Sequence, residues 1–289
     1  MTSSDDGLVL VTGATGNTGR GVVRALAERG VPVRAMVRRE ADRDGFPAGV
    51  QVTVGDFDDP GSLAAALDGA ARAYLVTPSS ERAGDQQRRF ADLAVRAGAG
   101  HLVVLSQLGA RADSPVRFLR YHAVVEEHIR GLGIGYTFLR PNLFFQGLLA
   151  FAPLVSAQSR FFAPIGDARV SAIDVRDIAG VAAAVLSEDG HEGATYTLTG
   201  PAAITHAEIA AALSAALGRE IRFADAAPED FGASLRGLMP DWQAEGLLED
   251  YAHYRRGEAA EVTTAVSDIS ARRPMDIGQF ARDYAEAFK

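Results

Sequence analysis

The stretch LVLVTGATGNTGRGVVRALAERG at residues 8–30 restricts the fold of this chain more than any other segment. Residues 8–12 are a continuous apolar run, which predicts a buried strand. Residues 19–30 place apolar side chains at helical spacing and stop at a glycine, which predicts an amphipathic helix. A strand that leads through a glycine-rich turn into a helix is typical of the first unit of a doubly wound α/β sheet. The glycines of this turn are Gly13, Gly16 and Gly19.

The alternation of strands and helices continues along the chain and indicates a parallel sheet that is covered on both faces. Apolar runs with strand-like composition are separated by segments with helical spacing of apolar residues. We therefore predict the α/β class, with a doubly wound parallel sheet of the Rossmann type. The further strands are expected at residues 31–37, 50–54, 71–76, 101–106 and 134–140.

The pattern changes after the sixth predicted strand. A capping box of Thr205 and Glu208 starts a later helix, and residues 228–256 are helical, aromatic and interrupted by glycine and proline. We expect a nucleotide-binding domain at residues 1–140 and a smaller C-terminal substrate lobe at residues 141–289, whose segments return to the sheet. Residues 228–256 are the candidate helical lid.

Each glycine of the first turn has a physical task in binding a phosphate. The first makes the tight turn, the second lets the backbone approach a pyrophosphate, and the third lets the helix pack on the strand. Free amides and the positive end of the dipole at the helix N-terminus then attract the phosphates. A structural turn without a ligand is the alternative, but the context of strand, turn and helix favours nucleotide binding. The expected contacts are Gly13, Thr15, Gly16, Asn17, Thr18 and Gly19.

Two arginines, Arg38 and Arg39, follow the second predicted strand, where an NAD-binding site carries a carboxylate. Guanidinium groups bind a 2'-phosphate through forked, charge-assisted hydrogen bonds. The pair therefore favours NADP(H) as the cofactor, and a solvated surface pair is the alternative interpretation. Along the same edge of the sheet, Asp56 and Phe57 are expected near the adenine, and Thr77 and Pro78 near the middle of the cofactor.

Charge and composition exclude several classes of function. The formal net charge of −8 and a pI near 5.3 argue against a nucleic-acid surface, which needs a basic stripe. The chain has no cysteine, which excludes disulfides, thiolate nucleophiles and sulfur-ligated metals, and we predict no metal site. Its apolar runs are short for a membrane span, and the acidic start MTSSDDG differs from a signal peptide. We expect a cytoplasmic monomer or homodimer with no membrane and no nucleic-acid partner.

A set of motifs is spread over nearly the whole chain. The motifs are GATGNTG at 13–19, the arginine pair, GDF at 55–57, Ser106 to Gly109, His122 to Glu126 with the spacing H-x-x-x-E, GIGYTFLRPN at 133–142 and DVRDIA at 174–179. Together they resemble the NmrA-like branch of the atypical short-chain dehydrogenases/reductases. That branch includes quinone oxidoreductases, reductases of aromatic dyes and natural products, and NADP-sensing regulators without catalytic activity. The resemblance implies the fold and NADP binding and leaves the reaction open.

In the wider superfamily a set of serine, tyrosine and lysine protonates the substrate oxygen as hydride arrives, and the lysine lowers the pKa of the tyrosine. Ser106 resembles that serine in position and Tyr121 is the nearest candidate tyrosine, but position 125 is Val and the only lysine is the last residue. Without a lysine, Tyr121 would keep a pKa near its reference value of about 10. Ser106 and Tyr121 are the catalytic candidates, with helix packing as the alternative for the tyrosine. His122 is either a proton shuttle or a structural histidine, and Glu126 is placed to pair with it.

The missing lysine also bears on the substrate. A quinone becomes a delocalised phenolate on reduction and needs little help from a proton donor, and a hydroxyaryl ketone shares its own phenolic proton. We therefore expect NADPH-dependent hydride transfer to a quinone or an aromatic, polyketide-like ketone. Further cofactor contacts are expected from Ser106, Pro141, Asn142 and Phe144, and substrate contacts from Gln107, Phe145, Trp242 and Tyr251.

Two other functions stay open. One is a non-catalytic NADP-binding regulator that senses redox state, which the lost lysine favours. The other is an ene-type reductase or isomerase of secondary metabolism, such as antibiotic or polyketide biosynthesis. The aromatic residues of the second lobe favour a small aromatic substrate, and a role in the core of the lobe is their alternative.

Overall fold

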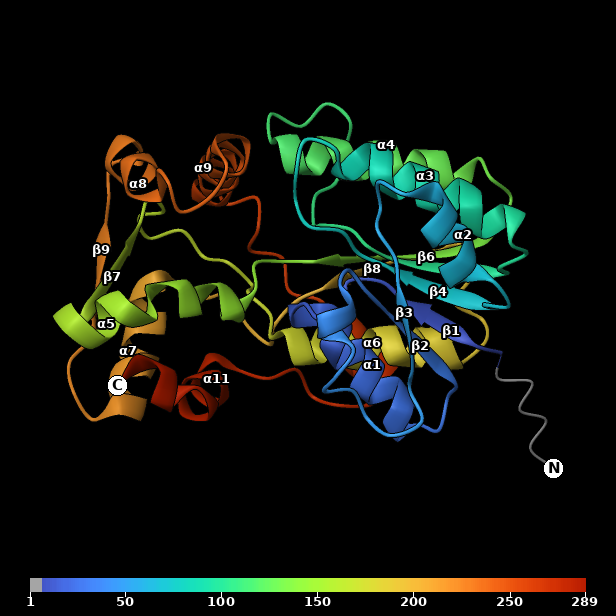
Figure 1. Cartoon of the computed structure of the whole chain (residues 1–289). Coiled ribbons are helices and arrows are strands. Elements are labelled where there is room, and N and C mark those ends of the chain that lie inside the picture. The colour runs from blue at the N-terminus through green and yellow to red at the C-terminus, as the bar shows by residue number, and fades with distance from the viewer. Residues whose placement is uncertain (1–6) are drawn as a thin grey trace. The chain divides into compact units, whose positions relative to one another are not determined.

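The computed structural model describes residues 7–289, and the chain divides into two compact units (Figure 1). Residues 1–6, on which the signal-peptide expectation depends, lie outside the described residues. Within residues 7–289, no helix combines the length and the apolar character needed to cross a membrane. Unit 1 comprises Met1–Ser106, Tyr121–Arg140 and Ile178–Tyr196, and unit 2 comprises Gln107–Arg120, Pro141–Asp177 and Thr197–Lys289.

Unit 1 is built on a sheet with the strand order β3-β2-β1-β4-β5-β6-β8. Every neighbouring pair from β3 to β6 is parallel. The order reverses at β1, which is the topological switch point of a doubly wound fold. The predicted α/β Rossmann fold and its six strands are confirmed. The strands are β1 (Val9–Val11), β2 (Val33–Val37), β3 (Gln51–Val54), β4 (Arg72–Leu75), β5 (His101–Leu105), β6 (Gly135–Pro141) and β8 (Ala194–Leu198).

Helices cover both faces of this sheet. Figure 1 shows α2, α3 and α4 on one face and α1 and α6 on the other. The first of these faces is packed with the large buried side chains of Leu63, Phe90 and Phe138. Burial of this kind stabilises by about 25 cal/mol per Å² of apolar surface, so the sheet and its helices form together. The elements are α1 (Asn17–Glu28), the 3-10 helix η1 (Glu40–Asp42), α2 (Pro60–Leu67), α3 (Ala83–Arg96), α4 (Arg117–Arg130) and α6 (Val175–Ser187).

Unit 2 has a small parallel sheet of β7 and β9, surrounded by helices. Helix α7 packs against α11 and β9, and α8 packs against β7 and α9. The core of this unit is rich in buried aromatic rings, including Phe161, Phe231 and Phe280. The elements are η2 (Phe145–Phe151), α5 (Ala152–Gln158), β7 (Arg160–Ala163), α7 (His206–Leu217), β9 (Arg222–Asp225), α8 (Pro228–Leu235), α9 (Asp241–Arg255), α10 (Ala265–Ser270), α11 (Ile277–Asp283) and η3 (Ala285–Phe288).

The boundaries of the two units can be set beside those expected from the sequence. Residues 107–120 belong to unit 2, and residues 178–196 belong to unit 1, where β8 is the last strand of the sheet. The second unit is about as large as the first. The segment expected to form a lid, residues 228–256, contains α8 and α9.

Candidate functional site

Only glycine fits at two positions of the turn after β1, Gly13 and Gly19. Gly13 has a φ of +57°, and a Cβ atom there would lie 2.7 Å from the Val76 side chain. A Cβ atom on Gly19 would lie 2.3 Å from the carbonyl oxygen of Gly13. A side chain at Gly19 would therefore push α1 away from the turn, and one at Gly13 would collide with Val76, which follows β4.

The N-terminus of α1 is open to a ligand. Gly16 is the N-cap residue and supplies no side-chain cap. Thr15, Gly16 and Asn17 are exposed, whereas Thr18 and Gly19 are buried beneath the turn. Amides in the first turn of a helix lack partners within the helix, and they carry the positive end of its dipole. This arrangement suits an anionic group such as a phosphate.

A cavity of about 540 Å³ extends from this turn along the carboxyl ends of β1, β2, β3 and β4. Some predicted contacts lie outside its lining: Asn17, Thr18 and Gly19 are in the first turn of α1, and the Thr77 hydroxyl accepts a hydrogen bond from Gln87 at 2.8 Å. The predicted cofactor contacts that line the cavity are Gly13, Thr15, Gly16, Arg38, Arg39, Asp56, Phe57 and Pro78.

The two arginines that line this cavity differ in their ion pairs. Arg39 forms a 2.7 Å ion pair with Asp42, and the hydrogen bond from Arg39 holds the pKa of the Asp42 carboxyl below its ordinary value. Arg38 is exposed and forms no ion pair with any of residues 7–289. Sequence reasoning missed Asp42, although an acidic residue so soon after the pair was the available signal. Arg38 is therefore the guanidinium that is ready for an anion.

Ser106, at the end of β5, belongs to a buried polar cluster. Its hydroxyl donates a 2.6 Å hydrogen bond to Glu126, whose side chain is 1% exposed. Arg140 contacts the same carboxylate at 2.5 and 2.9 Å, and Arg130 contacts it at 3.0 Å. Burial raises the pKa of Glu126, but hydrogen bonds from Arg140 and Ser106 outweigh it and hold this pKa below its ordinary value. The carboxylate is therefore ionised, and the Ser106 proton points to it.

Tyr121 and His122 lie side by side on α4, with ring centroids 4.2 Å apart. Tyr121 is half-buried and packs toward Gly84 of α3. His122 is buried, and burial lowers its pKa to about 3, so its imidazole is neutral at physiological pH. Its Nδ1 atom has no hydrogen-bond partner among the described residues. The expected pairing of Glu126 with His122 is replaced by the contacts of Glu126 with Ser106 and the arginines.

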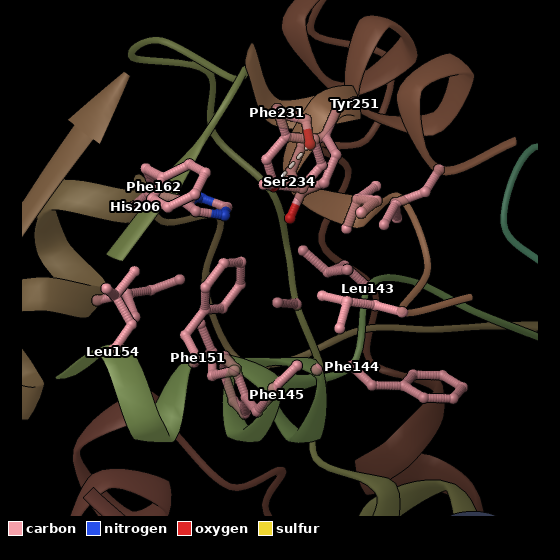
Figure 2. Close-up of a pocket in the computed structure, with 18 of the residues that line it drawn as sticks. Leu143, Phe144, Phe145, Phe151, Leu154, Phe162, His206, Phe231, Ser234 and Tyr251 are labelled. Atoms are coloured by element: carbon pink, nitrogen blue, oxygen red, sulfur yellow. Dashed lines mark hydrogen bonds between the residues drawn. The ribbon is translucent and has the colours of Figure 1, made fainter. Parts of the chain in front are cut away.

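A second cavity, of about 430 Å³, lies entirely within unit 2 (Figure 2). Three residues that the sequence suggests as cofactor or substrate contacts line this cavity: Phe144, Phe145 and Tyr251. Figure 2 shows the Phe144 ring on the side away from the middle of the cavity. Sequence reasoning missed most of its wall, because the segments that form it lie far apart in the sequence. The missed residues include Phe151, Leu154, His206, Phe231, Ser234 and Leu235.

Other predicted residues of unit 2 have internal partners. The Asn142 amide donates to Ser171 and to the Ala259 carbonyl at 2.8 Å each, and its oxygen accepts from the amide of Leu143. The Asn142 side chain thus ties three segments together, a role not anticipated from the sequence. Pro141, which precedes it, is buried at the end of β6 and hydrogen bonds through its carbonyl to the Leu108 amide at 2.9 Å.

Trp242 and Gln107 lie outside the lining of the unit 2 cavity. Trp242 packs on Phe118 with ring centroids 5.3 Å apart. Gln107 donates to both carboxyl oxygens of Asp250 at 3.0 and 3.2 Å. Burial raises the pKa of Asp250 to about 7 against the opposing effect of this hydrogen bond. The aromatic residue of α9 that does face the cavity is Tyr251.

Comparison with known proteins places these features in a family. The model of the NmrA-like family matches residues 5–284. The NAD(P)H azoreductase of Xenophilus azovorans is 36% identical over 97% of this chain and 99% of its own length. The (4-alkanoyl-5-oxo-2,5-dihydrofuran-3-yl)methyl phosphate reductase of Streptomyces griseus is 36% identical over 97% of this chain and 99% of its own. Among solved structures, an NADPH-dependent quinone oxidoreductase from Escherichia coli complexed with NADPH has a TM-score of 0.86 and 28% identity, covering 95% of this chain and 99% of that one. This chain belongs to the NmrA-like family.

Proposed function

We propose that this protein is an NADPH-dependent reductase that delivers hydride to a quinone or an aromatic ketone. The observation that carries this proposal is the unit 1 cavity, which has the uncapped helix α1 at its glycine turn and the arginine pair beyond it. Similar proteins include an NAD(P)H azoreductase and a quinone oxidoreductase with bound NADPH, which supports the same activity here.

The residues of the cavity fit NADP(H). A Cβ atom at Gly19 would overlap the backbone of the turn, so glycine there lets α1 pack closely on the loop, and the exposed Gly16 leaves backbone that a pyrophosphate can approach. Arg38 supplies the unpaired positive charge that a 2'-phosphate needs, and Arg39 can add a second when it exchanges Asp42 for the phosphate. Asp56 and Phe57 form the wall where the adenine is expected.

Bound NADPH would supply a hydride, and one further proton from solvent or a side chain would complete the reduction of a carbonyl to an alcohol or of a quinone to a hydroquinone. Around Ser106, the described residues of the chain offer only weak acids for that proton. The Ser106 proton is held by the ionised Glu126, and His122 is neutral. Such a site suits a substrate that stabilises its own developing charge, as quinones and hydroxyaryl ketones do. Tyr121 remains the candidate donor for an ordinary ketone.

The unit 2 cavity supports a small aromatic substrate. Its lining is mostly apolar and aromatic, and a cavity of about 430 Å³ lies within the size range of ligand sites. A regulator that binds NADP without turnover has no evident use for such a cavity, so the reductase is the better supported function.

The test is anaerobic NADPH consumption by the purified protein with a panel of quinones and hydroxyaryl ketones, with NADPH binding measured in the same samples. Consumption with a panel member, accompanied by one equivalent of reduced product, supports the reductase. Tight NADPH binding without consumption across the panel favours the NADP-binding regulator. Rearranged product without net NADPH loss favours the isomerase.

A further inference from the structure

The wall of the unit 2 cavity is rigid and carries no charge. None of the residues that line it is Asp, Glu, Lys or Arg. Its aromatic rings brace one another: Phe162 and Phe231 meet at 87° with centroids 6.0 Å apart, and Phe231 and Tyr251 meet at 78° with centroids 5.1 Å apart. Edge-to-face packing of this kind stabilises aromatic pairs beyond their burial, so the cavity is formed before a ligand enters.

One polar side chain in this wall lacks a partner. His206, the first residue of α7, is 2% exposed, and its Nδ1 atom has no hydrogen-bond partner among residues 7–289. Figure 2 shows the nitrogen-bearing edge of its ring toward the cavity, and the Nδ1 atom is itself almost completely covered by the surrounding wall. The rings of Phe223, Phe161 and Tyr251 lie around the imidazole, with centroids 5.3, 6.1 and 6.2 Å away. A hydrogen bond to a ring face is weaker than one to an oxygen atom.

The charge state of His206 limits what can bind beside it. Burial lowers its pKa to about 4, so the imidazole is neutral at physiological pH and has one N–H donor and one acceptor nitrogen. Ser234 also lines the cavity, and its hydroxyl donates to the Phe231 carbonyl at 2.6 Å, which leaves only its oxygen for a ligand. A charged group would lose its hydration here without meeting an opposite charge.

We infer that the unit 2 cavity binds the hydrophobic, uncharged body of a small molecule, aryl or alkyl, that presents a carbonyl or hydroxyl oxygen to His206. This deepens the proposed function, on which it rests, by naming the chemistry of the substrate: an aromatic carbonyl compound enters with its neutral oxygen-bearing part toward α7. An anionic group such as a carboxylate or phosphate stays outside this cavity.

The test uses equilibrium binding to the full-length protein by calorimetry, without nucleotide. The probes are 2-acetylnaphthalene, 2-ethylnaphthalene and 2-naphthoate, which share a ring system and differ in the polar group. We expect the ketone to bind roughly two- to tenfold more tightly than the hydrocarbon, as one net hydrogen bond predicts. We expect the carboxylate to bind at least about tenfold more weakly than the ketone.

Variants then locate the interaction. His206→Phe should remove the advantage of the ketone over the hydrocarbon while binding of the hydrocarbon is kept, and His206→Gln should restore part of it. Leu154→Trp on α5 fills the cavity and should weaken both neutral probes by at least about tenfold. Ala157→Trp, on the exposed side of the same helix, is the matched control and should leave binding unchanged.

Three results would overturn the inference: carboxylate binding as tight as ketone binding, equal loss of both neutral probes in His206→Phe, or unchanged binding in Leu154→Trp. Because no NADPH is present, the outcome is independent of turnover. If the protein consumes NADPH but fails these binding tests, its substrate binds elsewhere. If the probes bind as expected but no assay shows NADPH consumption, the assignment of the cavity stands and the proposed reductase function is removed.

Discussion

The Ser106 hydroxyl donates a hydrogen bond to the Glu126 carboxylate at 2.6 Å, and Arg140 donates to both oxygens of that carboxylate. A hydroxyl has a single proton, so Ser106 can accept a hydrogen bond from a ligand but cannot donate one while this contact persists. The serine that the sequence suggests as a proton donor is thus engaged in a buried ionic cluster.

Ser106→Ala is therefore expected to affect stability more than chemistry. Loss of a hydrogen bond to an ionised group should lower the free energy of unfolding by about 1–2 kcal/mol, because Glu126 keeps its two arginines. Turnover should fall by less than about tenfold, since general acid catalysis by a side chain is worth about a hundredfold or more. Urea denaturation and steady-state kinetics check both. A hundredfold loss of turnover at unchanged stability would mean that this proton does reach the substrate.

Glu126→Gln should be more damaging to the fold than Ser106→Ala. It removes a charge that is 1% exposed and leaves Arg140, only 23% exposed, beside a neutral amide. Breaking a buried pair costs about 3–5 kcal/mol, and partial exposure of the arginines reduces this to about 2–3 kcal/mol. Urea denaturation of the two variants in parallel measures the difference, and equal stability would contradict the central role of this carboxylate.

Arg38→Ala should weaken NADPH binding by roughly tenfold or more and NADH binding very little, because only NADPH carries the 2'-phosphate. Arg39→Ala should have a smaller effect, since Arg39 already pairs with Asp42, and Asp42→Asn should strengthen NADPH binding by releasing it. Fluorescence titration with both nucleotides provides the measurement. Arg24→Ala, an exposed residue of α1, is the control. Equal losses for NADPH and NADH would remove this account of cofactor choice.

Tyr121→Phe separates the two substrate classes. If Tyr121 supplies the proton, the variant should reduce a hydroxyl-free aromatic ketone about a hundredfold more slowly, while a quinone, which needs little acid help, should be reduced at nearly the same rate. Tyr136→Phe is the control, because Tyr136 is also half-buried in unit 1 and stacks on Phe138. Unchanged rates for both substrates would transfer the role to water.

Asp250 should make stability depend on pH. Burial raises its pKa from 3.8 to about 7, with a contribution from the neighbouring Glu249 and opposition from Gln107. The folded protein therefore keeps this proton over a range where the unfolded chain has lost it, so stability falls as pH rises from about 4 to about 7 and levels off above.

The variant Asp250→Asn removes this titration. It should raise the free energy of unfolding at pH 8, by at most on the order of 4 kcal/mol, and change it little near pH 4. Asp177, whose pKa is raised to about 6 by burial, acts in the same direction but is present in both proteins and cancels in the comparison. Asp241→Asn, exposed on the same helix, is the control. An effect of equal size at both pH values would contradict the prediction.

Local features were predictable from the sequence because their causes are local. The apolar runs became strands, Asp59 caps α2 through the Gly61 amide at 3.0 Å, and Thr205 and Glu208 form the capping box of α7. The glycine turn has the strained backbone that its spacing suggests. In each case the interacting groups lie within a few residues, so the pattern of residue types suffices.

The partners of polar side chains were not predictable in this way. Glu126 is one helical turn from His122, yet it contacts Ser106 and Arg140, because parallel pairing of β5 with β6 brings these two side chains to one place. Ionised donors then compete for the carboxylate more strongly than a neutral imidazole does.

By itself, the sequence determined the alternation of strands and helices, the glycine turn with its arginine pair, and membership of a family that binds NADP. Only the tertiary structure decided which arginine is unpaired, where the proton of Ser106 points, and that short segments far apart in sequence enclose an uncharged cavity around His206. The physical reason is the range of the interactions. Periodicity and turn geometry act over a few residues, whereas burial, ion pairing and cavity shape depend on which distant side chains packing brings into contact.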